Sequence, residues 1–276
     1  MDWAVTQSGN RYGSLGALTA SSSGTTITAP ATANTKTGAA WTTVIASTDT
    51  PGNGLLLTMF NTVATIVNRL VDIGIGAAGA EQVLIPNLLF SNGIADTPAT
   101  VYIPLRIPVG VRISARMQAS TASNALIIAG NVHAGVWYGP VPYSRVVNYG
   151  ANLATSRGIS IDAGATANTK PATWTTIGAT TTEVAHGIII GLGNQNNTLR
   201  NPATWLIDVG VGAAASEQAL ITNYIARGNV NEMVTPVFSP FLPCRIPQGS
   251  RIAMRAQCTS TTSTDRTFDG MIYVVV

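Results

Sequence analysis

The chain has 276 residues, of which 46% are hydrophobic and only 10% are charged. Disorder is excluded, because disordered chains combine low hydrophobicity with high net charge and the mean hydropathy here is +0.27. A membrane-spanning helix is excluded because the uncharged apolar runs fall far short of the roughly 18 residues it needs, and the net charge of +3 is spread along the chain without the basic patch of a nucleic-acid-binding protein.

The composition favours β-structure. Thr (36 residues), Ser (18) and Gly (27) are abundant, whereas long helices would require more Glu, Lys, Leu and Arg. Lysine occurs only twice, as Lys36 and Lys170. With so few charges, the surface has to stay hydrated mainly through hydroxyl, amide and backbone groups.

Three blocks of sequence occur twice in the same order, which indicates a tandem duplication. The second block is identical at 10 of 16 positions and the third at 9 of 20. The blocks are ATANTK (31–36 and 165–170), LVDIGIGAAGAEQVLI (70–85, returning as LIDVGVGAAASEQALI at 206–221) and YIPLRIPVGVRISARMQAST (102–121, returning as FLPCRIPQGSRIAMRAQCTS at 241–260). Each copy has the size of one domain and is too long for a solenoid unit.

The chain therefore divides into four segments. Residues 1–30 lack a strong apolar period and are expected to form an extended N-terminal arm, followed by a first domain at 31–132. Residues 133–163 form a connector before the second domain at 164–276. The connector is dense in aromatic residues and is expected to pack against a domain or a neighbouring subunit; they are Trp137, Tyr138, Tyr143 and Tyr149.

Each copy begins with a Trp-Thr-Thr strand, in which Trp41 and Trp174 are expected to anchor the core or its rim. In the second block, β-branched residues alternate with Asp72 and Gly74, and such glycines indicate that another backbone or a large side chain passes close by. The third block alternates strictly over residues 111–118, the pattern of a half-buried strand, after a Pro-x-Gly turn.

With the shorter runs, each copy contains about seven or eight short strands separated by Gly and Pro turns. The predicted fold is all-β, with two tandem jelly-roll-like antiparallel β-sandwich domains. An immunoglobulin-type sandwich is the alternative, although the Cys, Trp, Cys spacing of antibody domains is missing.

Motifs for catalysis and cofactor binding are missing from the sequence. His133 and His186 lie at non-equivalent places, without metal-ligand spacing, and the sequence contains no nucleophile elbow and no phosphate-binding glycine loop. We therefore assign no catalytic, cofactor-binding or metal-binding residue. Cys258 lies on the apolar face of a strand and is expected to be a buried free thiol, and a disulfide with Cys244 is disfavoured by the strand register.

Four carboxylates recur in pairs, Asp72 with Asp208 and Glu81 with Glu217. Paired carboxylates can hydrolyse glycosides. Arginines recur together with them, however, and we interpret the acids and bases as structural ion pairs. These arginines are Arg106 with Arg245, Arg112 with Arg251, and Arg116 with Arg255.

The run I-P-x-G-x-R-I-x-x-R-x-Q, at residues 107–118 and 246–257, is preceded in the first copy by DIGIGAAGAEQVLIP. This arrangement resembles structural proteins of tailed-bacteriophage virions. The resemblance implies a non-enzymatic virion component that is assembled in the host cytoplasm and contacts the major capsid protein or other virion proteins.

Among such components, a low-charge, Thr-rich β-protein with a polar arm favours a capsid cement or decoration protein. It would brace neighbouring capsid subunits, because a protein that binds only the assembled state stabilises that state. We also expect it to form a homo-oligomer, for example a trimer. The alternatives are a phage tail, fibre or adaptor component and a carbohydrate- or receptor-binding module, with a glycosidase as the least favoured.

Overall fold

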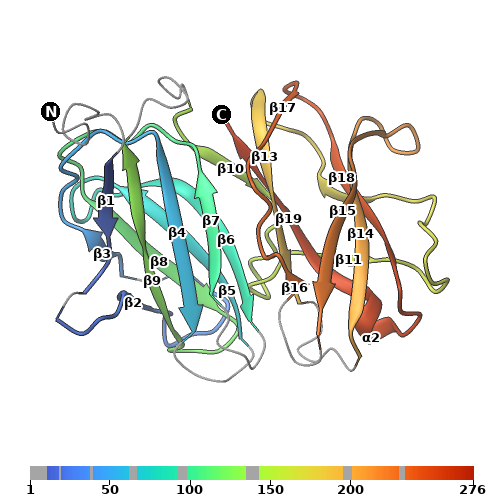
Figure 1. Ribbon diagram of the computed structural model, residues 1–276, viewed down its shortest axis with the longest axis horizontal. Helices are drawn as coiled ribbons and strands as arrows, with labels where there is room; N and C mark the ends of the chain where they lie inside the picture. The colour runs from blue at the N-terminus through green and yellow to red at the C-terminus, as the bar shows by residue number, and fades with distance from the viewer. Residues whose placement is uncertain are drawn as a thin grey trace, which may run out of the picture.

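The computed structural model describes residues 11–18, 20–37, 40–61, 67–92, 98–134, 143–194, 201–229 and 234–276. These residues form four antiparallel β-sheets and one short helix, α2 (Ser263–Arg266) (Figure 1). In this part of the chain, no helix is long and apolar enough to cross a membrane. The all-β prediction is confirmed.

The first half of the chain folds as one sandwich of two sheets. Sheet 1 has the strand order β1-β9-β4-β7, with β2 also paired to β9, and sheet 2 has the order β3-β8-β5-β6. The strands are β1 (Arg11–Leu15), β2 (Thr25–Thr28), β3 (Thr42–Ile45), β4 (Gly54–Asn61), β5 (Val67–Ile75), β6 (Gln82–Asn92), β7 (Ala99–Ile103), β8 (Ile113–Ala119) and β9 (Ala125–Ala134).

The second half repeats this arrangement. Sheet 3 has the order β10-β19-β13-β17, with β11 also paired to β19, and sheet 4 has the order β12-β18-β14-β15-β16. The strands are β10 (Val146–Tyr149), β11 (Ile159–Asp162), β12 (Thr175–Gly178), β13 (Ala185–Gly193), β14 (Ala203–Val211), β15 (Gln218–Gly228), β16 (Val234–Thr235), β17 (Leu242–Ile246), β18 (Ile252–Cys258) and β19 (Thr267–Val275).

Both halves have the nested strand pairing of a jelly roll. In the first half, β2 pairs with β9, β3 with β8, β4 with β7 and β5 with β6, all antiparallel. In the second half, β11 pairs with β19, β12 with β18, β13 with β17 and β14 with β15. One such nested set of four pairs, folded into two facing sheets, defines a jelly-roll sandwich, so the chain contains two of them. Sheets 1 and 3 are therefore equivalent, as are sheets 2 and 4.

The structure extends each repeat beyond the boundaries expected from the sequence. The described part of the expected N-terminal arm, residues 1–30, contains β1 and β2, and both pair with β9. The described part of the expected connector, residues 133–163, contains β10 and β11, which pair with β19 in the same way. These strands are only four or five residues long, which is too short for an apolar period to stand out in the sequence.

The apolar residues of the predicted alternation in the third block lie in the cores of the two sandwiches. In β8, Ile113, Ala115 and Met117 are fully buried between sheets 1 and 2. In β18, Ile252, Met254 and Ala256 occupy the same places between sheets 3 and 4. Each sandwich thus buries one face of each of its sheets, as half-buried strands require.

The two sandwiches stack, so that the four sheets form successive layers from sheet 1 to sheet 4 (Figure 1). The outer face of sheet 2 lies against the outer face of sheet 3, and β6 contacts both β10 and β13. As a result β5 is buried at all but its last position, and β19 at all but its first. The first apolar core accordingly continues into outward-facing residues of sheet 3, such as Ile189, Met271 and Val275.

Polar contacts fix the register of this stacking. The Tyr273 hydroxyl donates to the carbonyl oxygen of Asn87 at 3.0 Å and accepts from the backbone N–H of Leu89 at 2.7 Å. Nearby, the backbone N–H of Asn194 donates to the Ser91 hydroxyl at 3.1 Å. Burying a phenol is favourable only when its hydroxyl is paired, and these partners satisfy both of its hydrogen-bonding roles.

One buried carboxyl group at this junction is poorly satisfied. Asp269 is fully buried opposite Gly193, and within the described ranges neither of its carboxylate oxygens makes a hydrogen bond of good geometry. Burial raises the pKa of Asp269 to about 7, although the nearby Arg157 charge and the Gly158 N–H favour the ionised form. The folded protein therefore holds a proton on Asp269 that an unfolded chain would release near pH 4.

We expect Asp269→Asn to stabilise the protein at pH 8. Between about pH 4 and pH 7 the unfolded chain ionises while the folded state keeps its proton, so the free energy of unfolding falls as pH rises. The penalty above pH 7 is at most about 4 kcal/mol, since one pKa unit is about 1.4 kcal/mol. Melting curves from pH 4 to pH 8 should show a gain in Tm for the variant that grows with pH.

The matched control is Asp162→Asn. The hydrogen bond from Arg266 lowers the pKa of Asp162, despite partial burial, so its ionised form stabilises the fold. This variant should lose stability at neutral pH and approach the parent at low pH, opposite to Asp269→Asn. A pH-independent effect of Asp269→Asn would show that its carboxyl group is not protonated in the folded state.

Candidate functional site

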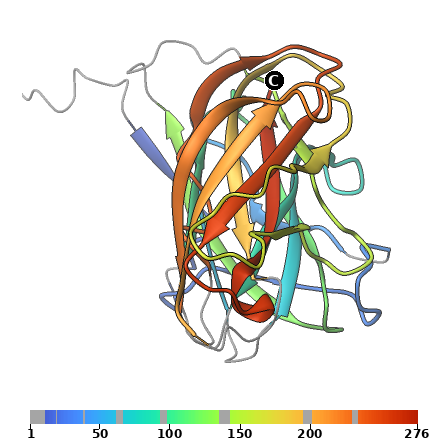
Figure 2. The ribbon, with the colours of Figure 1, turned by 90° about the vertical axis from the view of Figure 1, so that its right-hand side faces the viewer.

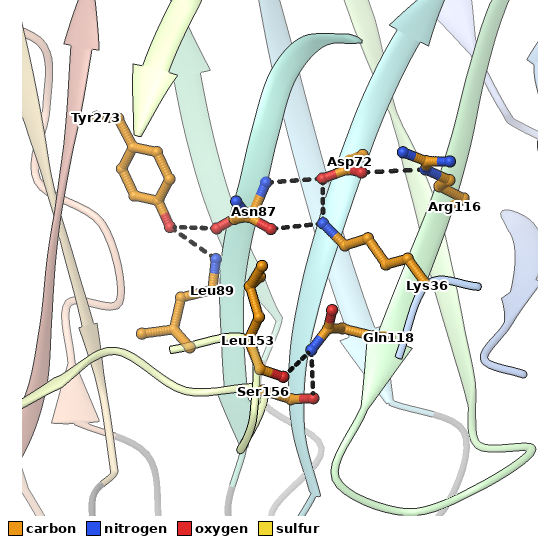
Figure 3. Close-up of polar contacts among 9 residues, drawn as sticks. All are labelled: Lys36, Asp72, Asn87, Leu89, Arg116, Gln118, Leu153, Ser156 and Tyr273. Atoms are coloured by element: carbon orange, nitrogen blue, oxygen red, sulfur yellow. Dashed lines mark hydrogen bonds and ion pairs between the residues drawn. The ribbon is translucent and has the colours of Figure 1, made fainter. Parts of the chain in front are cut away.

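The first charge cluster lies on the outer face of sheet 2 and consists of Lys36, Asp72, Asn87 and Arg116, which Figure 3 shows, together with Trp41. One Asp72 oxygen accepts from the Lys36 ammonium and, at 2.9 Å, from the backbone N–H of Asn87. The other oxygen accepts from Arg116 Nε at 3.1 Å. Lys36 also donates to the side-chain oxygen of Asn87. Asp72 thereby ties the loop that carries Lys36 to three strands of the sheet.

The second charge cluster has the same construction on the outer face of sheet 4 and consists of Lys170, Trp174, Asp208, Asn223 and Arg255. Asp208 accepts from Lys170, from the backbone N–H of Asn223 at 3.0 Å and from Arg255 Nε at 3.0 Å. The two lysines of the protein thus perform the same task in the two repeats. The structural ion pairs predicted from the recurring Asp and Arg residues are confirmed at these positions.

A tryptophan covers each cluster. The Arg116 guanidinium lies 4.5 Å from the Trp41 ring centre, and that of Arg255 lies 4.4 Å from the ring centre of Trp174. The tryptophan rings also lie against Gly74 and Gly210, where an added Cβ would come within 2.7 and 2.8 Å of ring atoms. The expected close approach of a large side chain to these glycines is confirmed.

A second ion pair accompanies each cluster. Arg112 pairs with Glu81, and its Nε donates to the Thr43 hydroxyl at 2.9 Å. The counterparts are Arg251 with Glu217, with a 2.9 Å hydrogen bond to Thr176. The hydrogen bond from Arg112 is the main cause that lowers the pKa of Glu81.

The electrostatics of the clusters fit a structural role. Burial lowers the pKa of Lys36, and the Asp72 carboxylate opposes this effect. Burial by itself would raise the pKa of Asp208, but the hydrogen bonds from Lys170, Asn223 and Arg255 outweigh it and hold the pKa below its ordinary value. A carboxylate with both oxygens engaged by charged donors is a poor general base, so the arrangement fastens loops to sheets and does not favour proton transfer.

The remaining charged candidates behave differently. Arg106 and Arg245, which the sequence placed among the ion-pairing residues, are exposed and form no ion pair among the described residues. That part of the prediction is wrong: Arg106 follows β7 of sheet 1 and Arg245 lies in β17 of sheet 3, whereas the recurring acids lie on or beside the strands of sheets 2 and 4. Cys244 and Cys258 are free, and Cys258 is buried, as expected.

The histidines do not come together. His133 contacts the Tyr102 hydroxyl through Nδ1 at 3.4 Å in the first half, and His186 stacks on Tyr143 with a 5.8 Å centroid separation in the second. Within the described ranges, no three His, Cys, Asp or Glu side chains are grouped as metal ligands.

Two of the four connector aromatics, Trp137 and Tyr138, lie outside the described residues. Tyr143 packs on Phe241 and His186, and the Tyr149 hydroxyl accepts from the backbone N–H of Thr182 at 2.8 Å. Both described aromatics therefore pack against the second half of the chain.

An open cavity of about 700 Å³ lies beside the first charge cluster, between the repeats. Its charged lining residues, Lys36, Asp72, Arg116 and Arg145, are each engaged in an ion pair. We therefore assign it no ligand.

Sequence reasoning missed the two asparagines of the clusters. Asn87 and Asn223 have φ of +55° and +57°, a left-handed conformation that asparagine tolerates better than most residues. This conformation points their N–H groups at the carboxylates. Extending the alignment of the second block by two residues, from VLI to VLIPN and from ALI to ALITN, would have identified them.

No protein-family model matches the sequence, and no curated protein matches it. Among solved structures, the chain shows a likeness to a crystal structure of pumpkin seed globulin, with 11% sequence identity, over 85% of this chain and 76% of that chain. The TM-score is 0.16, so this likeness carries no argument about fold or function.

We expect Asp208→Asn and Asp72→Asn each to lower the free energy of unfolding by about 3 kcal/mol, because each leaves a lysine and an arginine without their buried counter-charge. Asp49→Asn is the control, since Asp49 is exposed and forms no ion pair in the described chain. Urea denaturation measures all three. Equal stability of the three variants would contradict the structural role of the clusters.

Proposed function

We propose that this protein is a non-enzymatic structural component of a virion, and specifically a cement or decoration protein that braces neighbouring capsid subunits. The observation that carries the proposal is the use of the scarce charges. In both repeats, equivalent acids, lysines and arginines form ion pairs that hold loops to sheets. Such use fits a rigid building block better than a site where charges must remain available for chemistry.

The outer face of sheet 1 supports the same role. Its outward side chains on β4 and β9 are uncharged and half-buried; they include Leu56, Thr58, Phe60, Ile127 and Ala129. An uncharged sheet face of this kind suits a contact made through shape and dispersion, with few ion pairs. The resemblance of the third sequence block to virion proteins of tailed bacteriophages then favours the capsid as the surface that it meets.

Copy number tests the proposal directly. Quantitative mass spectrometry of the purified virion should find this chain in hundreds of copies, because a cement protein binds repeatedly over the shell. Added to capsids that lack it, the chain should raise the temperature at which they disassemble, since it binds the assembled state and not the separate subunits.

A dozen or fewer copies would refute the cement role and indicate the tail, fibre or adaptor alternative. Absence from the virion, together with a positive glycan array, would instead support the carbohydrate-binding alternative. A deletion that probes the expected arm should be confined to residues 1–10, because β1 and β2 belong to sheet 1 and their removal would damage the fold.

A further inference from the structure

The contact between the two sandwiches joins unlike faces. The outer face of sheet 2 meets the outer face of sheet 3, and these sheets are the equivalents of sheets 4 and 1. Such a contact is heterologous, and each of its two faces has a counterpart at an end of the stack. The outer face of sheet 4 and the outer face of sheet 1 are therefore the structural equivalents of the two surfaces that contact each other inside the chain.

A loop of the second repeat completes the internal contact (Figure 3). The turn between β10 and β11 lies on sheet 2, where the Gln118 side-chain amide donates to the Leu153 carbonyl at 2.7 Å and to the Ser156 hydroxyl at 3.0 Å. Ser156 in turn donates to the Asn34 side-chain oxygen at 2.9 Å. Gln118 and Ser156 are buried as a result.

All three side chains are retained at the ends of the stack. The counterparts of Asn34 and Gln118 on sheet 4 are Asn168 and Gln257, and the counterpart of Ser156 in the β1–β2 turn is Ser22. These three side chains form no hydrogen bond within the described part of the chain, and Ser22 and Asn168 are exposed.

The backbone that presents these side chains is retained too. Ser22 has φ +51° and its counterpart Ser156 has φ +56°, and Asn34 and Asn168 have φ +56° and +57°. Serine rarely adopts this conformation. In the first repeat, Ser22 keeps this left-handed conformation although it makes no contact like those of Ser156 with Gln118 and Asn34 in the described chain.

An apolar side chain on sheet 4 also lacks the cover that its counterpart has. Leu89 is fully buried where sheet 3 packs on sheet 2, whereas its equivalent on β15, Ile225, is 62% exposed. Figure 2 looks onto this end of the stack, with the orange strands β14 and β15 toward the viewer. At the other end, the outer face of sheet 1 offers an uncharged surface.

We propose that a second copy of this chain docks head to tail, with the outer face of its sheet 1 on the outer face of sheet 4 and its β1–β2 turn on Asn168 and Gln257. Repetition of this heterologous contact closes a ring or extends a filament. The proposal concerns contacts between copies and needs no capsid, so its failure would leave the capsid-binding role to be judged by its own test.

The contact between copies differs in detail from the internal one. Ser91 lies near Gly193 inside the chain, and the corresponding residues at the ends are Arg227 and Phe60. These larger side chains hold the two faces further apart, and an arginine can stack on a phenylalanine ring. The association is therefore weaker than the internal contact and depends on concentration.

A mixing experiment with two cysteine variants tests the geometry. Ser22→Cys and Asn168→Cys chains, mixed at high protein concentration with oxidised glutathione, should form a disulfide-linked heterodimer. Mass tags on the two variants identify it. Each variant oxidised alone contains the same native thiols and is the control. A heterodimer yield no higher than the yield of either variant alone would overturn the proposal.

Sedimentation with a matched pair of substitutions tests the interface. Ile225→Arg should weaken self-association about tenfold, whereas Val109→Arg should leave it unchanged, because Val109 is 58% exposed but lies in the β7–β8 turn outside both faces. Thermal melts establish that both variants fold. Equal effects of the two substitutions, or a parent chain that stays monomeric at every concentration tested, would refute the docking mode.

Discussion

Two sandwiches that stack in the same direction cannot satisfy all of their faces. The internal junction buries the outer faces of sheets 2 and 3 against each other, and the equivalent faces of sheets 4 and 1 remain at the two ends. A two-fold arrangement would have paired like faces and closed the assembly, whereas this heterologous arrangement does not. The ends of this molecule therefore carry the equivalents of both joined faces as a consequence of its topology.

The two charge clusters hold the loops that cover the outer faces of sheets 2 and 4, although the chain has few charged residues. In each repeat a single aspartate, Asp72 or Asp208, fixes a loop across the outer face of its sheet through a lysine and an arginine. The cluster is placed at the internal junction in one repeat and at an end of the stack in the other, with nearly the same hydrogen bonds. Its geometry is therefore set within each repeat and does not depend on the neighbouring sandwich.

The sequence predicted what lies within one repeat better than what lies between repeats. The duplication, the jelly-roll class, the Asp–Arg pairs and the close contacts at Gly74 and Gly210 all follow from short-range pattern and repetition. The strands β1, β2, β10 and β11 were missed because each is only four or five residues long, too short for an apolar period to stand out. The stacking was missed because it depends on isolated side chains such as Tyr273, although the continuous apolar run of β13 is typical of a strand covered on both faces.

Divergence between the repeats follows the partner that each face meets. Tyr273, which hydrogen-bonds across the junction, corresponds to Asn131 on sheet 1, whose buried side-chain oxygen has no hydrogen-bond partner among the residues that the structure describes. The asparagine, glutamine and serine of the turn contact are kept in both repeats. Inside the chain the covalent linkage holds the two faces at a high effective concentration, whereas separate chains must be brought together. A shell that binds many copies side by side would supply that proximity, so the proposed capsid role would favour the proposed head-to-tail contact.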